Sequence, residues 1–224
     1  MKILLTTLGF SLLIFFNACE LKNAQKNFVA TDFVADSTFT KGAEGPAVDK
    51  SGNVYAVNFA KQGTVGLILP NGKAELFIVL PDGSIGNGIR FSKYGDMYIA
   101  DYKKHNILKV NMHSKQISVH AHDSSLNQPN DIAIADNGTL FASDPNWSES
   151  SGNLWKITTK GEFVLLEDSM GTTNGIEVSH DNSKLFVNES VQRNVWVYDL
   201  SDNGEISNKK LFYKFDDFGM DGMR

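Results

Sequence analysis

An all-β fold is predicted by two regularities in this chain. An oxygen-bearing side chain recurs five times, at steps of 43, 43, 44 and 47 residues, and a tight polar turn that leads into a strand-like run recurs in the same register. A fixed period in the forties, made of strands alone, is typical of a β-propeller with one four-stranded blade per repeat. The five oxygen-bearing residues, called the head residues below, are Glu44, Asn87, Asn130, Asn174 and Asp221.

Within each repeat the expected strands follow the head residue in a constant order. A short strand-like run comes first, and a polar turn then leads into a second strand of alternating apolar and small residues. The second-strand segments are SGNVYAVNF (51–59), YGDMYIADY (94–102), NGTLFASDP (137–145) and NSKLFVNES (182–190). Their turn residues Gly52, Gly95, Gly138 and Ser183 are 43, 43 and 45 positions apart, so a second landmark keeps the register of the first.

Two further strands complete each predicted blade. The third strands are expected at 66–70, 107–111, 154–158 and 195–199, and the fourth at 75–80, 117–121, 162–167 and 210–215. No window after residue 20 sustains an apolar period of 3.6 residues, which argues against helices. The sequence therefore predicts about four complete blades and the start of a fifth at Asp221.

The composition is compatible with this fold and excludes some partners. A hydrophobic fraction of 42% suffices for a packed core, and 19 Gly against 5 Pro suits many tight turns. The formal net charge of -5 argues against a nucleic-acid or anionic-membrane partner. His120 and His122 lie two apart on an expected strand, but no Cys or further His stands beside them, so we interpret them as ordinary strand residues rather than metal ligands.

The N-terminus has the layout of a targeting segment. Lys2 is followed by an apolar run from Ile3 to Phe16, which is too short for a comfortable membrane span and predicts a signal peptide over residues 1–18. Cys19, the only cysteine, follows a small residue at the end of that run, as in a bacterial lipoprotein. We predict lipidation at Cys19, a tether over 19–27 and attachment in the periplasm or on the cell surface, with the lipid as the only membrane contact. The alternative is a cleaved signal peptide, an incidental Cys and a secreted protein.

The repeats resemble the regucalcin/gluconolactonase family of six-bladed β-propellers, of the senescence-marker-protein type. The resemblance covers about residue 40 to the last residue and rests on several segments in this order and spacing: EGPAVDKSGNVYAVN, NGIRFSKYGDMYIADY, QPNDIAIADNGTLFASDP, TNGIEVSHDNSKLFVNES and MDGMR. It implies a propeller domain over residues 28–224 with one divalent cation in the central channel. By the same resemblance, the metal ligands are Glu44, Asn130, Asn174 and Asp221, and Asn87 is a substrate contact or a neighbour of the ligands.

The residue types of this set suit a hard cation. Two carboxylates and two amide oxygens, without a thiolate or clustered imidazoles, favour Ca²⁺, with Mg²⁺ or Zn²⁺ as alternatives. Such an ion would polarise a lactone carbonyl as a Lewis acid, and the resemblance makes Asp221 the base that takes a proton from the attacking water. The competing interpretation is that Asn-Gly and Asp-Gly pairs only form turns or cap strands. For Asn87 alone the two interpretations have equal weight.

Three more positions bear on the site. Asp144 lies in a DP segment that resembles a stretch lining the channel mouth in some family members, so we predict a substrate contact for Asp144. Trp147 follows it, and we favour a strand-ending turn there. Arg90 lies either on a face that reaches the channel or at a blade edge. No serine has the glycines of a nucleophile elbow around it, so a serine hydrolase is not expected.

The chain departs from the family pattern in length. Six blades of this period need about 260 residues, and the sequence stops three residues after Asp221, so we expect a C-terminally truncated propeller. Phe28 to Ala35 alternates like an outer strand that would close the last blade of a complete ring, and the segment of Asp221 would lack its strand. We therefore expect this chain to be a poor enzyme, and lactonase turnover equal to that of a longer version would contradict this.

Two function classes follow from the sequence. The first is a metal-dependent hydrolase of a small sugar-derived lactone. The second is a non-catalytic propeller lipoprotein that binds a sugar or a protein through the same channel or its rim, because this fold alone does not decide activity. The sequence predicts neither the identity of the lactone nor the oligomeric state.

Overall fold

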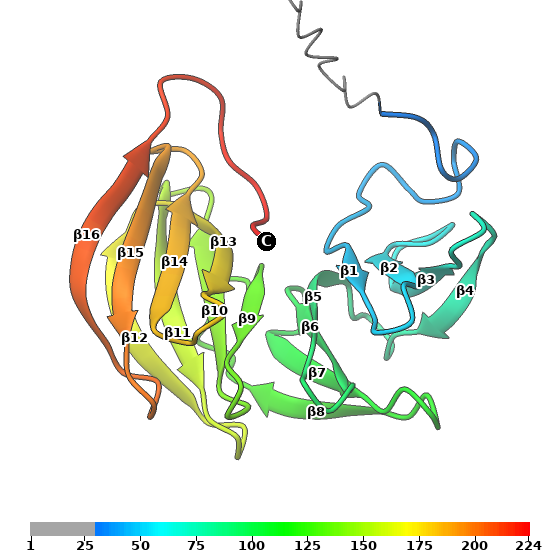
Figure 1. The fold of residues 1–224 in the computed structure, drawn as a ribbon, viewed down its shortest axis with the longest axis horizontal. Helices are drawn as coiled ribbons and strands as arrows, with labels where there is room; N and C mark the ends of the chain where they lie inside the picture. Colours follow the sequence, from blue (N-terminus) through cyan, green and yellow to red (C-terminus); the bar gives the residue numbers. More distant parts are fainter. Residues whose placement is uncertain (1–29) are drawn as a thin grey trace, which may run out of the picture. The chain divides into compact units, whose positions relative to one another are not determined.

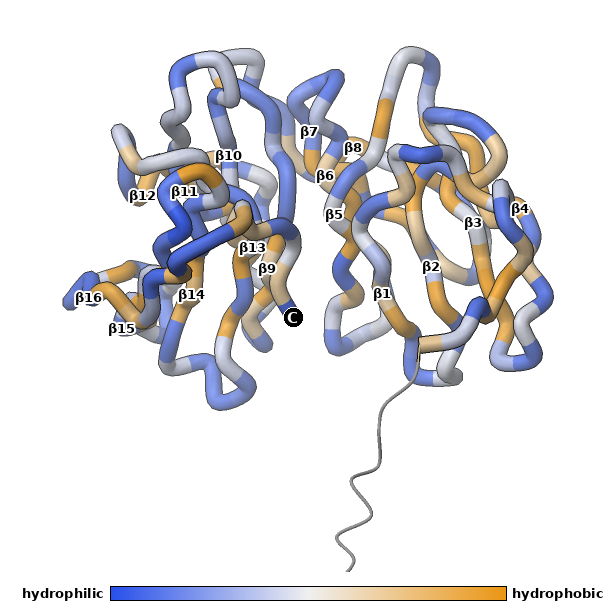
Figure 2. Tube along the Cα trace, turned by 90° about the horizontal axis from the view of Figure 1, so that it is seen from above, coloured by the Kyte–Doolittle hydropathy of each residue, from blue (hydrophilic) through white to orange (hydrophobic). Residues whose placement is uncertain are grey.

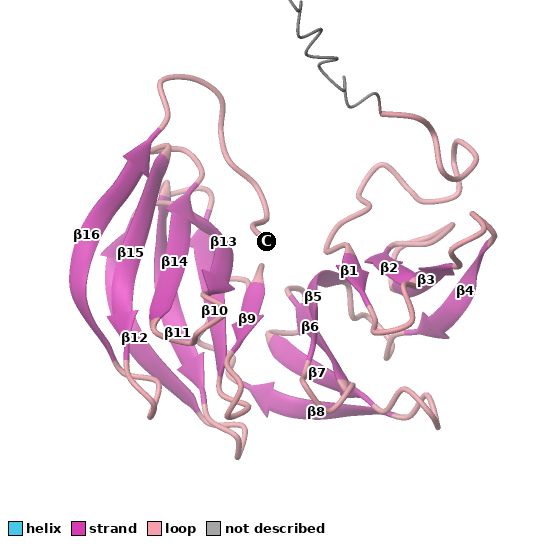
Figure 3. Ribbon diagram, viewed as in Figure 1, coloured by secondary structure: helices cyan, strands magenta, loops and turns pink. Residues whose placement is uncertain are grey.

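Strands and turns make up all of the regular structure seen here (Figures 1 and 3). This is a computed structural model, and it describes residues 30–224. The predicted signal peptide, Cys19 and the tether at 19–27 lie outside the described residues. Within residues 30–224, no helix is long and apolar enough to cross a membrane.

The strands form four separate antiparallel sheets of four, each in sequence order. The first sheet contains β1 (Ala47–Val48), β2 (Val54–Val57), β3 (Thr64–Ile68) and β4 (Ala74–Val79). The second contains β5 (Gly86–Phe91), β6 (Met97–Asp101), β7 (Asn106–Val110) and β8 (Ile117–His122). The third contains β9 (Ile132–Ile134), β10 (Leu140–Asn146), β11 (Ser151–Ile157) and β12 (Phe163–Met170). The fourth contains β13 (Thr173–Val178), β14 (Lys184–Glu189), β15 (Asn194–Leu200) and β16 (Ile206–Lys214). The predicted all-β fold with one four-stranded sheet per repeat is confirmed.

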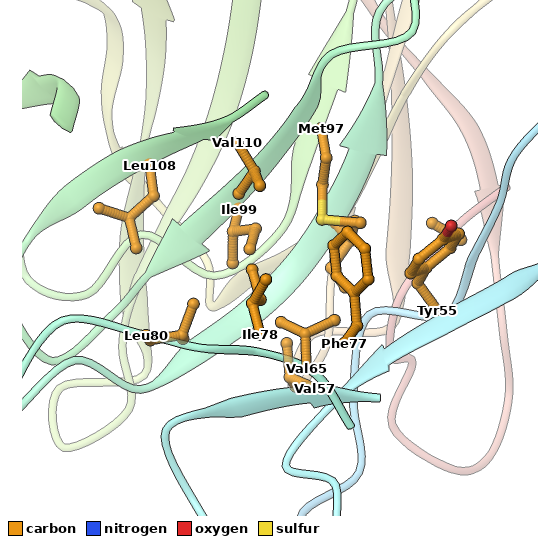
Figure 4. Packing of buried hydrophobic residues seen from close by; sticks show 12 residues of the cluster. Tyr55, Val57, Val65, Phe77, Ile78, Leu80, Met97, Ile99, Leu108 and Val110 are labelled. Atoms are coloured by element: carbon orange, nitrogen blue, oxygen red, sulfur yellow. The ribbon is translucent and has the colours of Figure 1, made fainter. Parts of the chain in front are cut away.

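Apolar side chains hold consecutive sheets together. Figure 2 shows apolar residues concentrated on the strands and polar residues in the turns. One cluster joins the first and second sheets, where Val57, Val65, Ile99 and Leu108 are fully buried (Figure 4). Corresponding clusters join the second sheet to the third and the third to the fourth. The period-2 alternation of the second strands thus places an apolar side chain between each pair of neighbouring blades.

The first strands of the four sheets surround the C-terminal segment. Contacts link β1 to β5, β5 to β9 and β9 to β13, and the chain end lies among these strands in Figures 1 and 2. Residues 221–224 form no strand, yet Arg224 donates hydrogen bonds to the carbonyl oxygens of Pro46 (3.1 Å) and Ile89 (2.9 Å). Side-chain contacts therefore hold the C-terminal segment in place, although residues 221–224 join no sheet.

The outer strand at Phe28 to Ala35 is predicted only for a complete ring, and the structure describes this segment from residue 30 onward. Residues 30–35 join no sheet, and the first backbone pairing is the isolated bridge between Phe39 and Phe59. The two rings pack edge to face, with centroids 5.4 Å apart. They cover Gly66 so closely that a Cβ there would lie 2.7 Å from each ring. Phe39, which follows the predicted strand, therefore contacts β3 through its aromatic ring and not through a β ladder.

Candidate metal and substrate site

All five head residues line one cavity of about 240 Å³. Asn87 and Asn174 lie near the start of β5 and β13, whereas Glu44 and Asn130 come just before β1 and β9. Asp221 reaches the cavity from the C-terminal segment. The remaining lining residues are Gly45, Pro46, Gly88, Asp131, Gly222, Met223 and Arg224. Residues that the sequence spaces 43 to 47 positions apart are thus brought together in space.

The glycine after a head residue lets the next head residue come close. Gly45 has φ of +57°, and a Cβ on it would lie 2.1 Å from the carbonyl oxygen of Asn87. A Cβ on Gly175 would lie 2.6 Å from the carbonyl oxygen of Asp221. Both contacts are far shorter than any side chain permits, so the Glu-Gly and Asn-Gly pairs are needed for close approach of the repeats.

Only one of the two polar atoms in the side-chain amide of Asn174 makes hydrogen bonds. Its Nδ2 donates to the main-chain oxygen of Met220 and to Oδ1 of Asp221, each at 3.4 Å. Its Oδ1 is buried and accepts no hydrogen bond, and the residue is 3% exposed. An unpaired buried acceptor costs about 1–3 kcal/mol, and a cation in the cavity would satisfy it.

The donor set fits a hard divalent cation. Residues 30–224 contain no group of three or more His, Cys, Asp or Glu side chains arranged to hold a metal. Among the lining residues, the carboxylates of Glu44 and Asp221 and the side-chain amides of Asn130 and Asn174 supply oxygens that could hold an ion in this cavity. Carboxylate and amide oxygens are the ligands that Ca²⁺ takes in proteins.

Negative charge is concentrated in the cavity. Partial burial raises the pKa of Glu44 above its ordinary value, and repulsion from Asp221 and Asp131 raises it further. Burial also raises the pKa of Asp131, against the opposing effect of the Arg90 guanidinium. A cation bound among these groups would relieve the repulsion that raises the pKa of Glu44.

Asp131, Glu177 and Arg224 were not predicted from the sequence, whereas Arg90 had two predicted alternatives. Asp131 follows Asn130 at the position where the other four repeats have Gly, and it lines the cavity. Arg90 pairs with Asp131 and is 6% exposed, so of the two alternatives for Arg90 an exposed blade edge is wrong, although its side chain does not line the cavity itself. Arg90, Glu177 and Arg224 all stand three residues after a head residue, where the other two repeats have Ala47 and Ala133. Charge at this repeat position was the signal that could have identified them.

Asp144 does not reach the cavity. It is 0% exposed, and its Oδ1 accepts a 2.7 Å hydrogen bond from the backbone nitrogen of Gln128. Its Oδ2 accepts one from Nε1 of Trp155 at 3.0 Å. The structure therefore contradicts the predicted substrate contact, because a buried carboxylate with both oxygens engaged cannot meet a ligand.

Asp144 is one of three carboxylates that make the same kind of hydrogen bond in successive repeats. At or near the end of the second strand, a carboxylate accepts a hydrogen bond from a backbone nitrogen two or three residues before the head residue of the same blade. The pairs are Asp101 with Ile85 (3.1 Å), Asp144 with Gln128 (2.7 Å) and Glu189 with Gly171 (2.8 Å). These carboxylates hold the chain in place just before it enters the cavity wall.

A rim of amide and aromatic side chains adjoins the cavity. A neighbouring hollow of about 290 Å³ shares Glu44, Asn87 and Asn130 with it. The other side chains of this rim are Asn58, Gln62, Tyr102, Gln128 and Trp147. Trp147 lies in the turn after β10, as favoured from the sequence, and is 43% exposed. Amides pair with hydroxyl groups and aromatic faces cover C–H surfaces, so the rim suits a polyhydroxylated ligand.

Comparisons with known proteins agree with this architecture. The SMP-30/Gluconolactonase/LRE-like region matches residues 42–224. A gluconolactonase of Zymomonas mobilis is 27% identical over 217 residues, which cover 84% of this chain and 60% of that protein. The diisopropyl-fluorophosphatase of Loligo vulgaris is 27% identical over 215 residues, 80% of this chain and 68% of that protein.

A solved structure has the same fold. The regucalcin of Agrobacterium tumefaciens, described as a calcium-binding protein, superposes with a TM-score of 0.69 at 20% identity, covering 87% of this chain and 69% of that one. The chain thus spans 60% of the length of the Zymomonas protein and about two thirds of the other two.

Proposed function

The chain belongs to the SMP-30/gluconolactonase/LRE-like family, and on that premise we propose that it acts as a metal-dependent hydrolase of a small sugar-derived lactone. The observation that carries the proposal is the convergence of five periodic oxygen donors on one cavity. Similarity to a gluconolactonase and to a second hydrolase supports a hydrolytic reaction.

Four of the head residues would hold the ion. Glu44 and Asp221 supply charge, and Asn130 and Asn174 supply neutral oxygens, of which Oδ1 of Asn174 is already buried and unpaired. We propose Ca²⁺, which the calcium-binding regucalcin supports, with Mg²⁺ and Zn²⁺ as alternatives. When bound, such an ion polarises a carbonyl group and stabilises negative charge that develops on its oxygen.

Asp221 is the candidate base. Its Oδ1 accepts hydrogen bonds from the backbone nitrogen of Gly222 (3.0 Å) and from Nδ2 of Asn174 (3.4 Å), which orient the carboxylate in the cavity wall. In this proposal a water oxygen attacks the lactone carbonyl carbon, and Asp221 takes the proton of that water. The ring C–O bond then breaks, the ring oxygen gains a proton, and the product is an open hydroxy acid.

The rim favours a lactone with several hydroxyl groups. Asn58, Gln62 and Gln128 present amides beside the cavity, and Oδ1 of Asn58 is buried without a hydrogen-bond partner. Asn87 lines both hollows together with Glu44 and Asn130. We assign Asn87 to the substrate because the family resemblance leaves it outside the set of four ion ligands. The unsatisfied acceptor on Asn58 would be satisfied by a ligand hydroxyl.

Ion binding is the first test. Calorimetric titration with Ca²⁺ should give one site, and Ca²⁺ should raise the thermal unfolding temperature. Glu44→Ala and Asn174→Ala should each abolish both effects. Asn111→Ala, which changes an exposed turn residue that accepts hydrogen bonds only from its own turn, is the matched control. Retained binding in both cavity variants would contradict the assignment.

Turnover separates a hydrolase from a binding protein. Gluconolactone hydrolysis is followed in a pH-stat, with this chain and with a version extended beyond Arg224, in calcium and in chelator. Calcium-dependent turnover that Asp221→Asn abolishes supports the hydrolase. Saturable Ca²⁺ and gluconate binding without turnover in either version would support the alternative, a non-catalytic sugar-binding propeller.

We also propose that Cys19 carries the lipid that holds the protein in the periplasm or at the cell surface. The support is the apolar run that ends at Ala18-Cys19. Metabolic labelling with a fatty acid should mark the wild-type chain and leave Cys19→Ser unmarked. An unlabelled wild-type chain recovered from the medium would favour secretion instead.

A further inference from the structure

We propose that Arg90 is a positioning residue that holds the head residues of different sheets at fixed distances from one another. It belongs to a set of four charged side chains at the centre of the propeller, called the axial cluster below. The axial cluster consists of Arg90, Asp131, Glu177 and Arg224. This inference rests on the proposed ion site but concerns residues outside the ligand set.

The guanidinium of Arg90 contacts oxygens from four segments of the chain. Its Nη1 donates to the carbonyl oxygen of Ile89 and lies 3.1 Å from Oδ1 of Asp131. Its Nη2 donates to Oδ2 of Asp131 (3.3 Å), the carbonyl oxygen of Ile176 (3.0 Å), Oε2 of Glu177 (3.3 Å) and the carbonyl oxygen of Met223 (3.1 Å). One side chain on β5 thus connects the second sheet to the third, the fourth and the C-terminal segment.

Every one of these contacts lies close to a head residue in the chain. Asp131 is adjacent to Asn130, Ile176 comes two residues after Asn174, and Met223 comes two residues after Asp221. Arg90 itself comes three residues after Asn87. The guanidinium therefore contacts the chain segments that carry four of the five head residues, and none of these hydrogen bonds is to the side chain of a head residue.

The β ladders cannot fix the distances between head residues of different sheets. Each sheet is hydrogen-bonded within itself, so the ladders fix a head residue relative to its own blade only. The apolar clusters that join the sheets are non-directional, and they leave the inner edges of the blades to be set by polar contacts. The axial cluster is a polar contact of this kind that spans three sheets.

Burial makes the contact specific for a guanidinium. Arg90 is 6% exposed and Asp131 is 3% exposed. A planar guanidinium can engage both carboxylate oxygens of Asp131 and the carbonyl oxygens together, whereas the single ammonium group of a lysine cannot reach all of them. Replacing Arg90 by an apolar residue would leave the buried Asp131 with only the longer 3.7 Å ion pair to Arg224 as a charged partner beside the cavity.

The test measures ion binding, not turnover. Wild type, Arg90→Met and Arg90→Lys are titrated with Ca²⁺ by calorimetry, and each is loaded with Tb³⁺, whose luminescence lifetime in H₂O and D₂O reports the number of coordinated waters. We expect Arg90→Met to bind Ca²⁺ roughly 10- to 100-fold more weakly, the range found when residues that orient metal ligands are changed. We expect it to add coordinated water, because a displaced protein oxygen is replaced by solvent. Arg90→Lys should be intermediate.

A matched control removes a buried cation elsewhere. Lys156 is also buried and pairs with Glu205, away from the cavity. Lys156→Met should lower thermal stability but leave Ca²⁺ affinity and the Tb³⁺ water count unchanged. If it weakens Ca²⁺ binding as much as Arg90→Met does, the effect is general loss of stability and the inference is overturned.

The remaining outcomes decide the matter in either direction. A folded Arg90→Met that binds Ca²⁺ as tightly as wild type, with the same water count, overturns the positioning role and leaves the proposed function intact. A wild-type chain that binds no ion overturns the proposed function and this inference with it. If Arg90→Met does not fold, Arg90→Lys decides: weaker Ca²⁺ binding with added water supports the role, and wild-type values overturn it.

Discussion

The side-chain amide of Asn188 donates a 2.7 Å hydrogen bond to the main-chain carbonyl oxygen of Asp221. Its own Oδ1 accepts a 3.1 Å hydrogen bond from the backbone nitrogen of Gly175. Asn188 lies on β14 and is buried, so it connects the C-terminal segment to the strand that carries Asn174. This contact explains how Asp221 keeps a defined position although residues 221–224 belong to no sheet.

Asn188→Asp should lower the magnitude of the free energy of Ca²⁺ binding by more than it lowers the free energy of unfolding. The carboxylate still accepts from Gly175, but it presents an oxygen to the carbonyl oxygen of Asp221, so the segment should be repelled from the cavity. Asn188→Ala also leaves the nitrogen of Gly175 unpaired, and should lower the free energy of unfolding by about 1–3 kcal/mol. Ca²⁺ titration and urea unfolding measure the two effects. Wild-type Ca²⁺ affinity in Asn188→Asp would show that the contact does not position Asp221.

Asp144→Asn should destabilise the fold without changing substrate affinity. The new amide NH₂ would face donors that now point at the carboxylate, among them Nε1 of Trp155. We expect the free energy of unfolding to fall by about 1–3 kcal/mol, while KM for the lactone at saturating calcium stays at the wild-type value. The reverse pattern, a raised KM with unchanged stability, would restore the substrate contact that the sequence predicted.

Trp147→Ala should impair substrate binding and leave the ion in place. Trp147 lines the rim and contributes an exposed aromatic surface there. Its loss should raise KM by roughly tenfold, about 1.4 kcal/mol of binding free energy, with Ca²⁺ affinity unchanged. Tyr94→Ala, which removes another exposed aromatic ring that lies outside the cavity and the rim, is the control. Equal KM values in the two variants would remove Trp147 from the substrate site.

His120 should make stability depend on pH. Burial lowers the pKa of His120 below its ordinary value of 6.5, and repulsion from Lys109 lowers it further. As the pH falls, His120 therefore takes up a proton in the unfolded chain before it does so in the folded chain. The contribution of neutral His120 to the free energy of unfolding is complete above about pH 6.5. It is lost as the pH falls through the lower pKa of the folded state. Urea unfolding between pH 7 and pH 5 should show a smaller decline for His120→Gln than for wild type. His113→Gln, at an exposed turn position, should decline as wild type does; identical slopes for all three would exclude His120 as the cause.

The period of the sequence predicted the fold and the convergence of the head residues. It succeeded because a propeller repeats one local unit, so that equal spacing along the chain places Glu44, Asn87, Asn130 and Asn174 at equivalent points of successive blades. It also predicted the strands of each sheet, with ends that differ by a few residues, because alternation and turn residues act locally.

The contacts that hold the head residues in place were not predictable in the same way. Asp144 was expected at the substrate because its DP segment resembles a stretch that lines the channel mouth in some family members, and the structure instead turns it inward to the backbone nitrogen of Gln128. The pairing of Arg90 with Asp131 joins residues 41 apart on different sheets, and no local pattern specifies such a partner. The presence of Asp101 and Asp144 at the same repeat position was the available sign of a structural role.

Each apolar cluster joins only two consecutive sheets, and this determines the order in which the sheets around the candidate ion site are expected to unfold. Where the apolar contacts link only neighbouring units, opening begins at the outermost units. Within residues 30–224 these are the first sheet, whose β1 follows Glu44, and the fourth, which carries Asn174 and the side chain that restrains Asp221. The two middle sheets can stay folded while either outer one opens. On heating, we therefore expect cation affinity to disappear before most of the β-sheet circular dichroism signal, so that the working lifetime of the site is shorter than that of the fold.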